Sequence, residues 1–427
     1  MFKNRRFVSL YYSSIGFKEI LILIWGFLLR VFSNKETLKK NNILKLFPEK
    51  SVYSFSSARG ALSACLDFAN VGPDDEVILS SFTCLAVPTA IVNLGAKPVY
   101  VDINLNTLNN DVNDIVDLIN PRVKAVILQH TFGNSADIKN LVKILKNKKI
   151  LLIEDCALSI GTKIDDKLLG NFGDASIFSM ELSKTITTGW GGILVLKNNY
   201  LKNVDLKYNN YYNNNLFEII TDVFQTVISA INNMPKFYFI GKYLSYGFFK
   251  LNFFRYSTPE NEISGFPSNN FISKLSFPFI YLANYQWNRL DDISDKCFKN
   301  HSIIQSKLRN NGYLILNQSN ITNKIKPISS RIAFLVKDRN LIIDFFLSNG
   351  VELGKWFDGP LTPEPKNMDF NYEKSKYINS IFISNHIVNI PCHYRLKDCD
   401  LNLINNLIDK FSRKYPNQNI NLDNFTK

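Results

Sequence analysis

The sequence predicts an α/β protein with a mixed, mostly parallel sheet, helices on both of its faces, and a smaller C-terminal α+β domain. Two patterns predict this fold class. From Ser54 to Leu196, short apolar runs alternate with helical periodicities. The runs are apolar at nearly every position, as in strands that are covered on both faces. A length of 427 residues leaves room for one large α/β unit and a smaller domain.

The individual elements follow from the same alternation. The predicted strands are Val77–Leu79, Val99–Val101, Ala125–Leu128, Ile150–Ile153, Ala175–Phe178 and Ile193–Val195. The predicted helices between them are Ala61–Asn70, Pro88–Leu94, Val112–Ile119 and Asp137–Lys146. Ligands of such sheets bind at the carboxyl ends of the strands. Polar residues that directly follow each run are therefore candidate site residues.

Composition excludes several classes of protein. Apolar residues make up 46% of the chain and charged residues 20%, which is enough to form a core and excludes wholesale disorder. The sequence has no collagen period, heptad run or repeat of 20–50 residues, so fibres and solenoids are excluded. Six scattered cysteines without a C-x-x-C pair, and only four histidines, predict neither a metal site nor a disulfide framework. Reduced thiols in a cytoplasmic protein are the expectation.

The positive charge is concentrated at the N-terminus. The net charge is +13, and residues 1–50 contribute more than half of it, with ten Lys or Arg against three Glu. The rest of the chain is near balance, which argues against a nucleic-acid binder. We expect residues 1–50 to form a basic, helical N-terminal segment.

Within this segment, Ile20–Leu29 is an uninterrupted apolar run. Ten helical residues reach only about 15 Å, half of a bilayer core, so a spanning helix is not predicted. No small-residue cleavage site follows, which argues against a signal peptide. Two interpretations remain. The favoured one is a helix packed on the protein's own body. The other is a helix in a membrane interface, with Lys18 and Arg30 at its rim.

Residues 201–265 are expected to form a helical, aromatic-rich insertion. Leu216–Ile231 has helical spacing, Pro235 ends that helix, and a segment dense in aromatic, Lys and Arg residues follows. This composition suits a membrane interface, but equally a lid or a subunit contact. Residues 51–200 are then the large domain, and residues 266–427 are its remainder with the C-terminal domain.

Three features carry the chemistry. Ser57 and Arg59 begin a helix, Asp155 follows the strand Ile150–Ile153, and Lys184 lies in a Ser/Thr/Gly-rich loop. Each signal is weak alone. Their order matches the needs of pyridoxal phosphate, whose phosphate binds a helix N-terminus, whose ring nitrogen pairs with an acid and whose aldehyde reacts with a lysine.

The chain from about Ser54 to Val195 resembles the DegT/DnrJ-type sugar aminotransferases, which are pyridoxal-phosphate enzymes of the aspartate-aminotransferase fold (fold type I). The matching phrases are GPDDEVILSSFTCLAVPTAIVNLGAKPVYVDINLNTLNND, VILQHTFGNSADI, LLIEDCALSIGTKI and TTGWGG after Lys184. Weaker similarity covers LANYQWNRLDDISDKC and VNIPCHYRLKDCDLNLINNLI. The resemblance implies that residues 51–200 bind the cofactor.

The resemblance also implies roles for particular residues. Lys184 would be the lysine bound to the cofactor and the carrier of the proton, and Asp155 would pair with the ring nitrogen. Phe82 would stack on the cofactor ring. The phosphate would be bound by Ser179 and by backbone amides of the turn that comprises Ser57, Ala58 and Arg59.

The chain departs from the family pattern at several positions. Leu158 replaces a common glutamine, Arg59 replaces a threonine, and Glu181 and Trp190 stand where other residues are usual. The cross-subunit asparagine has no clear match near residues 271–276. These departures keep open a pyridoxal-phosphate protein with altered or lost transaminase chemistry. An inward-facing Arg59 would strengthen phosphate binding.

Residues near the motifs also have structural interpretations. His130 is expected to be a hydrogen-bonded structural histidine and Cys156 a core residue. Trp190 would either pack beside the cofactor loop or stack on a sugar, and packing is the favoured interpretation.

The implied reaction transfers an amino group, with glutamate as the expected donor, to a keto-sugar nucleotide for surface polysaccharide or lipopolysaccharide synthesis. A cytoplasmic homodimer is implied, with no nucleic-acid partner. The second alternative is an enzyme held peripherally at the inner face of the membrane that acts on a lipid-linked glycan.

Overall fold

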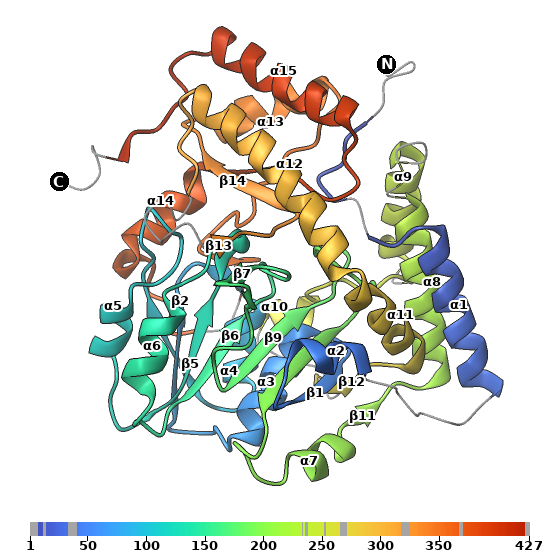
Figure 1. The fold of residues 1–427 in the computed structure, drawn as a ribbon, viewed down its shortest axis with the longest axis vertical. Coiled ribbons are helices and arrows are strands. Elements are labelled where there is room, and N and C mark those ends of the chain that lie inside the picture. Colours follow the sequence, from blue (N-terminus) through green and yellow to red (C-terminus); the bar gives the residue numbers. More distant parts are fainter. Residues whose placement is uncertain are drawn as a thin grey trace.

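A nine-stranded mixed sheet forms the centre of the molecule (Figure 1). The computed structural model describes residues 7–11, 14–32, 41–232, 234, 238–251, 253–264, 271–316, 325–366 and 370–422. The strand order is β11-β12-β1-β10-β9-β6-β5-β2-β4. Neighbours from β9 to β4 run parallel, whereas β10 pairs antiparallel with both β9 and β1. The predicted fold class, a mixed and mostly parallel sheet, is confirmed.

All six predicted strands are present, and each is longer than predicted by one or more residues. One of them, β6, also begins one residue later than predicted. They are β2 (Glu76–Ser80), β4 (Lys97–Val101), β5 (Val123–Gln129), β6 (Leu151–Asp155), β9 (Ala175–Ser179) and β10 (Gly192–Lys197). The sequence did not predict β1 (Lys50–Phe55), because Ser51 and Ser54 interrupt its apolar run. The short strands β11 (Tyr212–Asn213) and β12 (Ser273–Lys274) complete the sheet.

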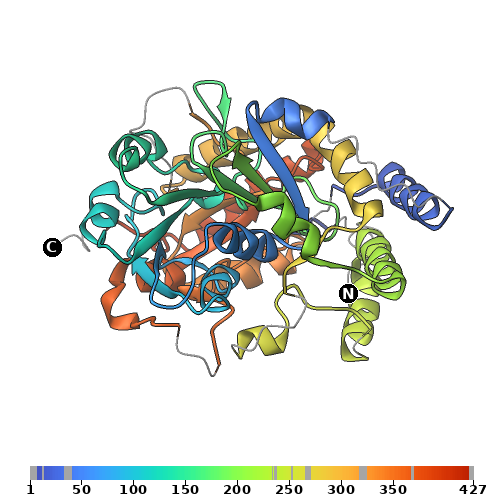
Figure 2. The same ribbon diagram turned by 90° about the horizontal axis from the view of Figure 1, so that it is seen from below.

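Helices cover both faces of the sheet (Figure 1 and Figure 2). One face packs against α3 (Ala58–Phe68), α4 (Ala86–Val92) and α7 (Val204–Asn210). The other face packs against α2 (Asn41–Leu46), α5 (Val112–Asp117), α6 (Ile138–Leu145), α11 (Phe277–Asn288) and α12 (Leu290–Asn310). The four helices predicted between the strands correspond to α3, α4, α5 and α6. Burial on both faces explains why the strands are apolar throughout.

The C-terminal part contains a smaller antiparallel sheet with its own core. In it, β14 (Arg331–Leu335) pairs with β16 (Ile387–Pro391), and α12, α13 (Arg339–Ser348) and α15 (Asp398–Lys414) pack against them. The remaining elements are α14 (Ile378–His386), the pair β3 (Thr83–Cys84) and β15 (Leu361–Thr362), the group β7 (Lys163–Ile164), β8 (Lys167–Leu168) and β13 (Ile325–Lys326), and two 3₁₀ turns at Thr131–Gly133 and Lys374–Lys376.

The apolar N-terminal run lies in helix α1 (Phe17–Phe32), which packs on α11. Its buried residues Ile20 and Leu23 join a cluster with Phe279 of α11, and Gly26 lies against Pro278. The favoured prediction of a helix packed on the body is confirmed for this face of α1. The insertion forms α8 (Leu216–Asn232), α9 (Tyr238–Lys250) and α10 (Glu260–Ile263). None of the helices in the described ranges is long and apolar enough to cross a bilayer.

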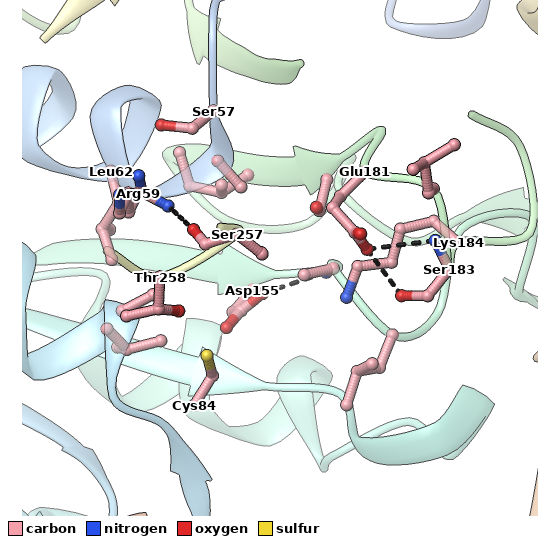
Figure 3. A pocket seen from close by; sticks show the side chains of 18 of the residues that line it. Ser57, Arg59, Leu62, Cys84, Asp155, Glu181, Ser183, Lys184, Ser257 and Thr258 are labelled. Atoms are coloured by element: carbon pink, nitrogen blue, oxygen red, sulfur yellow. Dashed lines mark hydrogen bonds between the residues drawn. The ribbon is translucent and has the colours of Figure 1, made fainter. Parts of the chain in front are cut away.

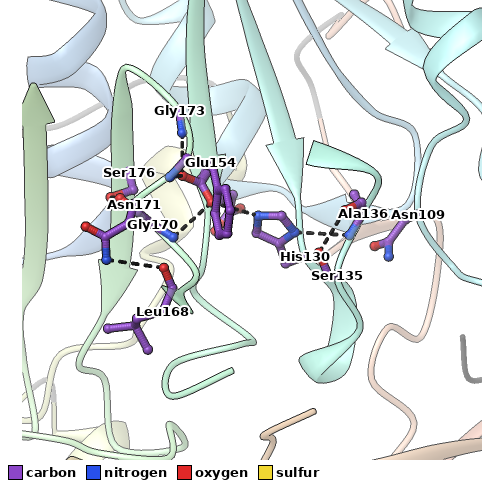
Figure 4. A network of polar contacts seen from close by, with 12 residues as sticks. Asn109, His130, Ser135, Ala136, Glu154, Leu168, Gly170, Asn171, Gly173 and Ser176 are labelled. Atoms are coloured by element: carbon purple, nitrogen blue, oxygen red, sulfur yellow. Dashed lines mark hydrogen bonds and ion pairs between the residues drawn. The ribbon is translucent and has the colours of Figure 1, made fainter. Parts of the chain in front are cut away.

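The buried carboxylate of Glu154 ties β6 to its surroundings (Figure 4). It accepts hydrogen bonds from the backbone N–H groups of Phe172 and Gly173, both at 2.7 Å, and of Gly170 at 2.8 Å. His130 Nε2 lies 3.3 Å from the same carboxylate, while His130 Nδ1 accepts from Ala136 N–H at 3.1 Å. Because Nδ1 accepts, the proton of a neutral imidazole lies on Nε2 and points at Glu154. This supports a structural role for His130.

The network also sets the charge state of Glu154. Burial alone would raise the pKa of this carboxyl, but the hydrogen bonds from His130 and the backbone N–H groups outweigh burial, and the pKa lies below its usual value. His130, Glu154 and Cys156 come close enough to resemble a metal site. The histidine and the carboxylate are already engaged by protein donors, so the cluster is structural.

Gly192 allows the start of β10 to touch the start of α3. A Cβ atom at Gly192 would lie 2.3 Å from the carbonyl oxygen of Ser57 and 2.4 Å from the nitrogen of Ala58. Both atoms are backbone and cannot swing aside. The absence of a side chain at Gly192 therefore places the N-terminus of α3 beside β10.

We predict that Glu154→Gln destabilises the protein by about 3 kcal/mol at neutral pH, because an amide nitrogen would face backbone donors. The pKa of Glu154 is lowered in the folded state, so its stabilisation is complete above the unfolded value near 4.5 and is lost as pH falls through the lower folded value. Urea unfolding across this pH range should show the loss in the wild type and not in the variant. The exposed Glu373→Gln is the control. Equal stability of Glu154→Gln and wild type at neutral pH would contradict the prediction.

We predict that Gly192→Ala destabilises the protein by about 1–3 kcal/mol, since its methyl group would push the backbone at Ser57 away. Gly247→Ala is the matched control. Gly247 lies in helix α9 with nothing within 4 Å of its would-be Cβ, so alanine should be neutral or stabilise by up to about 1 kcal/mol. Urea midpoints of the three proteins test this, and an unchanged midpoint for Gly192→Ala would count against it.

Candidate active site

A cavity of about 520 Å³ lies at the carboxyl ends of the central strands (Figure 3). Gln129, Asp155 and Ser179, the last residues of β5, β6 and β9, contribute to its wall. The N-terminus of α3 and the loop that carries Lys184 add two further sides. The prediction that a site would form at this edge of the sheet agrees with the cavity's position.

Lys184 lies in a loop that its own hydrogen bonds hold in shape. The Lys184 N–H donates to the Glu181 carbonyl oxygen at 3.0 Å, and the Glu181 carboxylate accepts from the N–H and the hydroxyl of Ser183 at 3.0 and 2.6 Å. Burial lowers the pKa of the Lys184 amine more than Glu181 raises it, and nearby Arg331 lowers it further. A larger share of neutral, nucleophilic amine follows.

Asp155 lies across the cavity from this amine, and Figure 3 shows the two side chains directed into the same space. The Asp155 carboxylate accepts from the Ala157 N–H at 2.9 Å. Burial raises the pKa of Asp155, and Ala157, Lys184 and His130 only partly oppose this. No cation of the described residues forms an ion pair with Asp155. A cationic group of a ligand would stabilise its charged form.

The N-terminus of α3 supplies an anion-binding corner. Ser57 caps the helix, and its side-chain oxygen accepts from the Gly60 N–H at 3.1 Å. Ser57, Ala58 and Arg59 all line the cavity, as does Ser179. Helix α3 has eleven residues, so its terminal N–H groups and dipole favour an anion at this end. The four predicted phosphate-site residues are thus brought together.

Arg59 faces the cavity but is already paired. Its Nε lies 2.8 Å from the carboxylate of Glu262, which is buried, and its Nη1 donates to the Ser257 carbonyl oxygen. Glu262 and Ser257 belong to the insertion. The expected inward orientation of Arg59 is therefore observed, but its charge is shared with Glu262 instead of being open to a ligand.

The structure does not bring Phe82 to the cavity wall. Phe82 is fully buried, with its ring centroid 5.1 Å from that of Phe357, and it does not contribute to the cavity wall, whereas Cys84 does. Residues 83 and 84 pair with β15, and this pairing leaves Phe82 in the core cluster beneath the site. The residue of SSFTC that lines the cavity is thus the small Cys84.

Cys156 agrees with its structural interpretation, whereas Trp190 packs in a core cluster and also lines the cavity. Trp190 is buried in a cluster with α1 and α11, and the Arg255 guanidinium lies 3.9 Å from its ring centroid. Cys156 is fully buried in the core. Leu158, which replaces the family's glutamine, lines the cavity.

Sequence reasoning missed residues that approach the site from distant segments. Tyr11 and Trp356 line the cavity. Arg331 is buried beside them, with its guanidinium 4.7 Å from the Tyr11 ring centroid and a 3.3 Å hydrogen bond to the Tyr11 hydroxyl. Arg331 forms no ion pair with any carboxylate in the described part of the chain. No local motif marks these residues, since only the fold brings them together.

The insertion also contributes to the wall, through Tyr256, Ser257 and Thr258. Gln225 of α8 makes two hydrogen bonds to the backbone of Arg255, the residue before Tyr256. The Gln225 Nε2 donates to the Arg255 carbonyl oxygen at 2.9 Å, and the Gln225 Oε1 accepts from the Arg255 N–H at 3.1 Å. The Arg255 side chain pairs with Asp222 of α8 at 3.0 Å. Contacts with α8 therefore hold this wall in place.

Comparison with known proteins matches these features. Residues 40–211 match the model of the DegT/DnrJ/EryC1/StrS aminotransferase family. A GDP-perosamine synthase of Vibrio cholerae is 38% identical over 146 residues, covering 34% of this chain and 40% of that protein. A spore coat polysaccharide biosynthesis protein of Bacillus subtilis is 35% identical over 145 residues, covering 34% and 37%. The match thus spans about two fifths of the length of these curated relatives.

Solved structures extend the likeness of the fold to most of the chain. A putative sugar aminotransferase of Streptococcus pneumoniae in its PLP form has a TM-score of 0.69 at 18% identity, covering 96% of this chain and 99% of that one. An aminotransferase of Helicobacter pylori involved in pseudoaminic acid biosynthesis has a TM-score of 0.69 at 17% identity, covering 96% and 100%. The chain therefore has the fold of these aminotransferases. The DegT/DnrJ-type resemblance of the sequence agrees with the family model that matches residues 40–211.

Proposed function

We propose that the protein is a pyridoxal-phosphate-dependent aminotransferase that transfers an amino group to a keto-sugar nucleotide. One observation carries the proposal. A buried lysine with a lowered pKa and a buried carboxylate face each other in one cavity, beside a capped helix N-terminus. The family match over residues 40–211 and the names of the relatives supply the reaction class.

The residues present fit pyridoxal phosphate. The cavity is of a size suited to a cofactor and part of a substrate. Asp155 lacks an ion-pair partner in the described residues, and a protonated ring nitrogen would supply one. Ser57, Ser179 and the backbone of α3 form an anion site, and the Ser179 hydroxyl makes no hydrogen bond within the described part of the chain. Lys184 supplies a buried amine.

Different residues of the chain have different roles in this proposed reaction. Pyridoxal phosphate, when bound, supplies an electron sink for the charge left when a substrate carbon loses its proton. Lys184 would hold the aldehyde of the cofactor, and its Nζ would carry the proton that the substrate loses. Asp155 would hold a proton on the ring nitrogen. The wall from Tyr256 to Thr258, with Leu158 and Trp356, limits the access of water.

We propose glutamate as the amino donor and a nucleotide-linked keto sugar as the acceptor. The relatives' names refer to GDP-perosamine and to spore coat polysaccharide, which suits a role in surface polysaccharide or lipopolysaccharide synthesis. The buried Arg331 near the cavity, which forms no ion pair in the described part of the chain, suits an anionic substrate. On the same resemblance we propose that the protein is cytoplasmic and forms a homodimer. Light scattering of the purified chain tests the oligomeric state.

A second candidate is a cofactor-binding protein with altered chemistry. Leu158 lines the cavity where the family's glutamine is common, and Cys84 lines it instead of the expected aromatic ring of Phe82. The decisive experiment incubates the purified protein with the cofactor, glutamate and a panel of nucleotide-linked keto sugars. Formation of 2-oxoglutarate with an amino sugar supports the transferase. Cofactor that borohydride traps on the protein, without amine transfer to any sugar, supports the second candidate.

Lys184→Ala should abolish amine transfer, with a loss of at least about 10²–10⁴-fold, because the variant has no amine in the cavity to hold the cofactor or move the proton. The variant should also lack the visible absorbance of the lysine-bound cofactor. Lys97→Ala, at an exposed position at the start of β4, is the control. Full turnover by Lys184→Ala would refute the assignment.

Asp155→Asn should reduce turnover by on the order of 10²-fold while cofactor affinity changes much less, since an amide cannot keep the ring nitrogen protonated. Titration of the cofactor-free protein measures the affinity, and the transfer assay measures turnover. If turnover stays within a few-fold of wild type, Asp155 is not the partner of the ring nitrogen.

A further inference from the structure

Three adjoining helices, α1, α8 and α9, form the edge of the molecule at the right of Figure 1. The inner side of α1 packs on α11, and α8 buries Ile219 and Ala230. Their other sides expose large apolar residues in helical stripes. Phe17, Leu21, Trp25, Phe217, Tyr243 and Leu251 are each between 50% and 79% exposed. We call the exposed sides of α1, α8 and α9, together with Leu251, the three-helix face.

Such a surface is unusual for a soluble protein. Single exposed apolar side chains are ordinary, but apolar stripes on adjoining helices mark a surface that contacts something else. The cavity does not use these residues, and the proposed reaction does not explain them.

The charges that the three-helix face leaves unpaired are positive. The acidic residues of α1 and α8 are already engaged: Glu19 pairs with Arg289, Asp222 pairs with Arg255, and Glu218 accepts hydrogen bonds from the Tyr212 hydroxyl at 2.9 Å and the Asn215 N–H at 2.8 Å. Helix α9 has no acidic residue.

The cations of the face remain open to solvent. Lys18 of α1 and Lys250 of α9 are both exposed. The face therefore combines apolar stripes with unneutralised positive charge.

We propose that the three-helix face docks on an anionic lipid surface. Trp and Tyr side chains beside lysines are typical of residues at the level of lipid headgroups, where the ring is partly buried and the cation meets phosphate. Helix α1 has 16 residues, about 24 Å of helix, and one of its sides is packed on α11, so it would lie along the surface. The inference does not depend on the proposed reaction.

A second copy of the chain fits this face less well. A two-fold contact pairs the same face of both copies. It would cover the exposed lysines of both copies, while the acidic residues of α1 and α8 are already engaged and α9 has none. A dimer that forms through another surface is compatible with docking. Because Tyr256 follows α9 by only six residues, docking would also bring the cavity wall close to the lipid surface.

The test is flotation of the full chain with vesicles of phosphatidylcholine alone, or of phosphatidylcholine with phosphatidylglycerol. We expect flotation with the anionic vesicles, less with the neutral ones, and less again at high salt, because salt screens the attraction of the lysines. No flotation with either vesicle at low salt would overturn the proposal.

Two double variants and a control test the surface itself. Trp25→Glu with Phe217→Glu should lower vesicle binding by on the order of tenfold or more, because two apolar anchors are lost. Lys18→Glu with Lys250→Glu should remove the preference for anionic vesicles. Ile378→Glu, at an exposed position of α14, should bind like the wild type. Circular dichroism checks that each variant is folded.

Vesicle binding that is unchanged in the Trp25/Phe217 variant would refute the three-helix face as the docking site. Light scattering distinguishes docking on lipid from the other possible occupant of this face, a second copy of the chain. If this variant changes a dimer into a monomer and the wild type does not float, the face joins two copies of the chain and the proposal is wrong. The transferase assay is run separately in solution, so a failure of docking and a failure of the proposed reaction can be told apart.

Discussion

Glu154 accepts three backbone hydrogen bonds and faces His130 inside the sheet, and the position of the site depends on this arrangement. Successive residues of a strand point to opposite sides, so the anchoring of Glu154 in the interior directs Asp155 to the other side, where the cavity lies. Two adjacent carboxylates thus have different states. Hydrogen bonds lower the pKa of Glu154, whereas burial raises the pKa of Asp155. One carboxylate stabilises the strand, and the other is available to a ligand.

Opposing charges also determine the state of the other ionisable groups around the cavity. Lys184 is buried among groups that oppose one another, with Glu181 favouring its cation and Arg331 disfavouring it. Arg59 is held by Glu262 at the rim. A ligand with a phosphate, a protonated ring nitrogen and an aldehyde would meet a complementary group at each place: the start of α3, Asp155 and Lys184.

The insertion links the inside of the molecule to its surface. Its segment 255–262 is held by Gln225, Asp222 and Arg59 and forms one wall of the cavity. Helices α8 and α9 of the same insertion expose apolar side chains to solvent. The sequence left three interpretations of this segment open, a lid, a subunit contact and a membrane contact. A lid does not exclude a contact with a membrane or a subunit, because different sides of the insertion face the cavity and the solvent.

The sequence by itself determined the elements and the order of the chemical groups. Apolar runs and helical periods depend on neighbouring residues only, so six strands, the helices between them, and the series Ser57, Asp155, Lys184 could be predicted locally. Contacts across hundreds of residues left no such pattern. Only the tertiary structure decided that Phe82 is in the core while Cys84 faces the cavity, that Arg59 pairs with Glu262, and that Arg331 lies near Lys184. These outcomes depend on which distant side chains compete for the same space and charge, and this is settled when the sheet, the small domain and the insertion pack together.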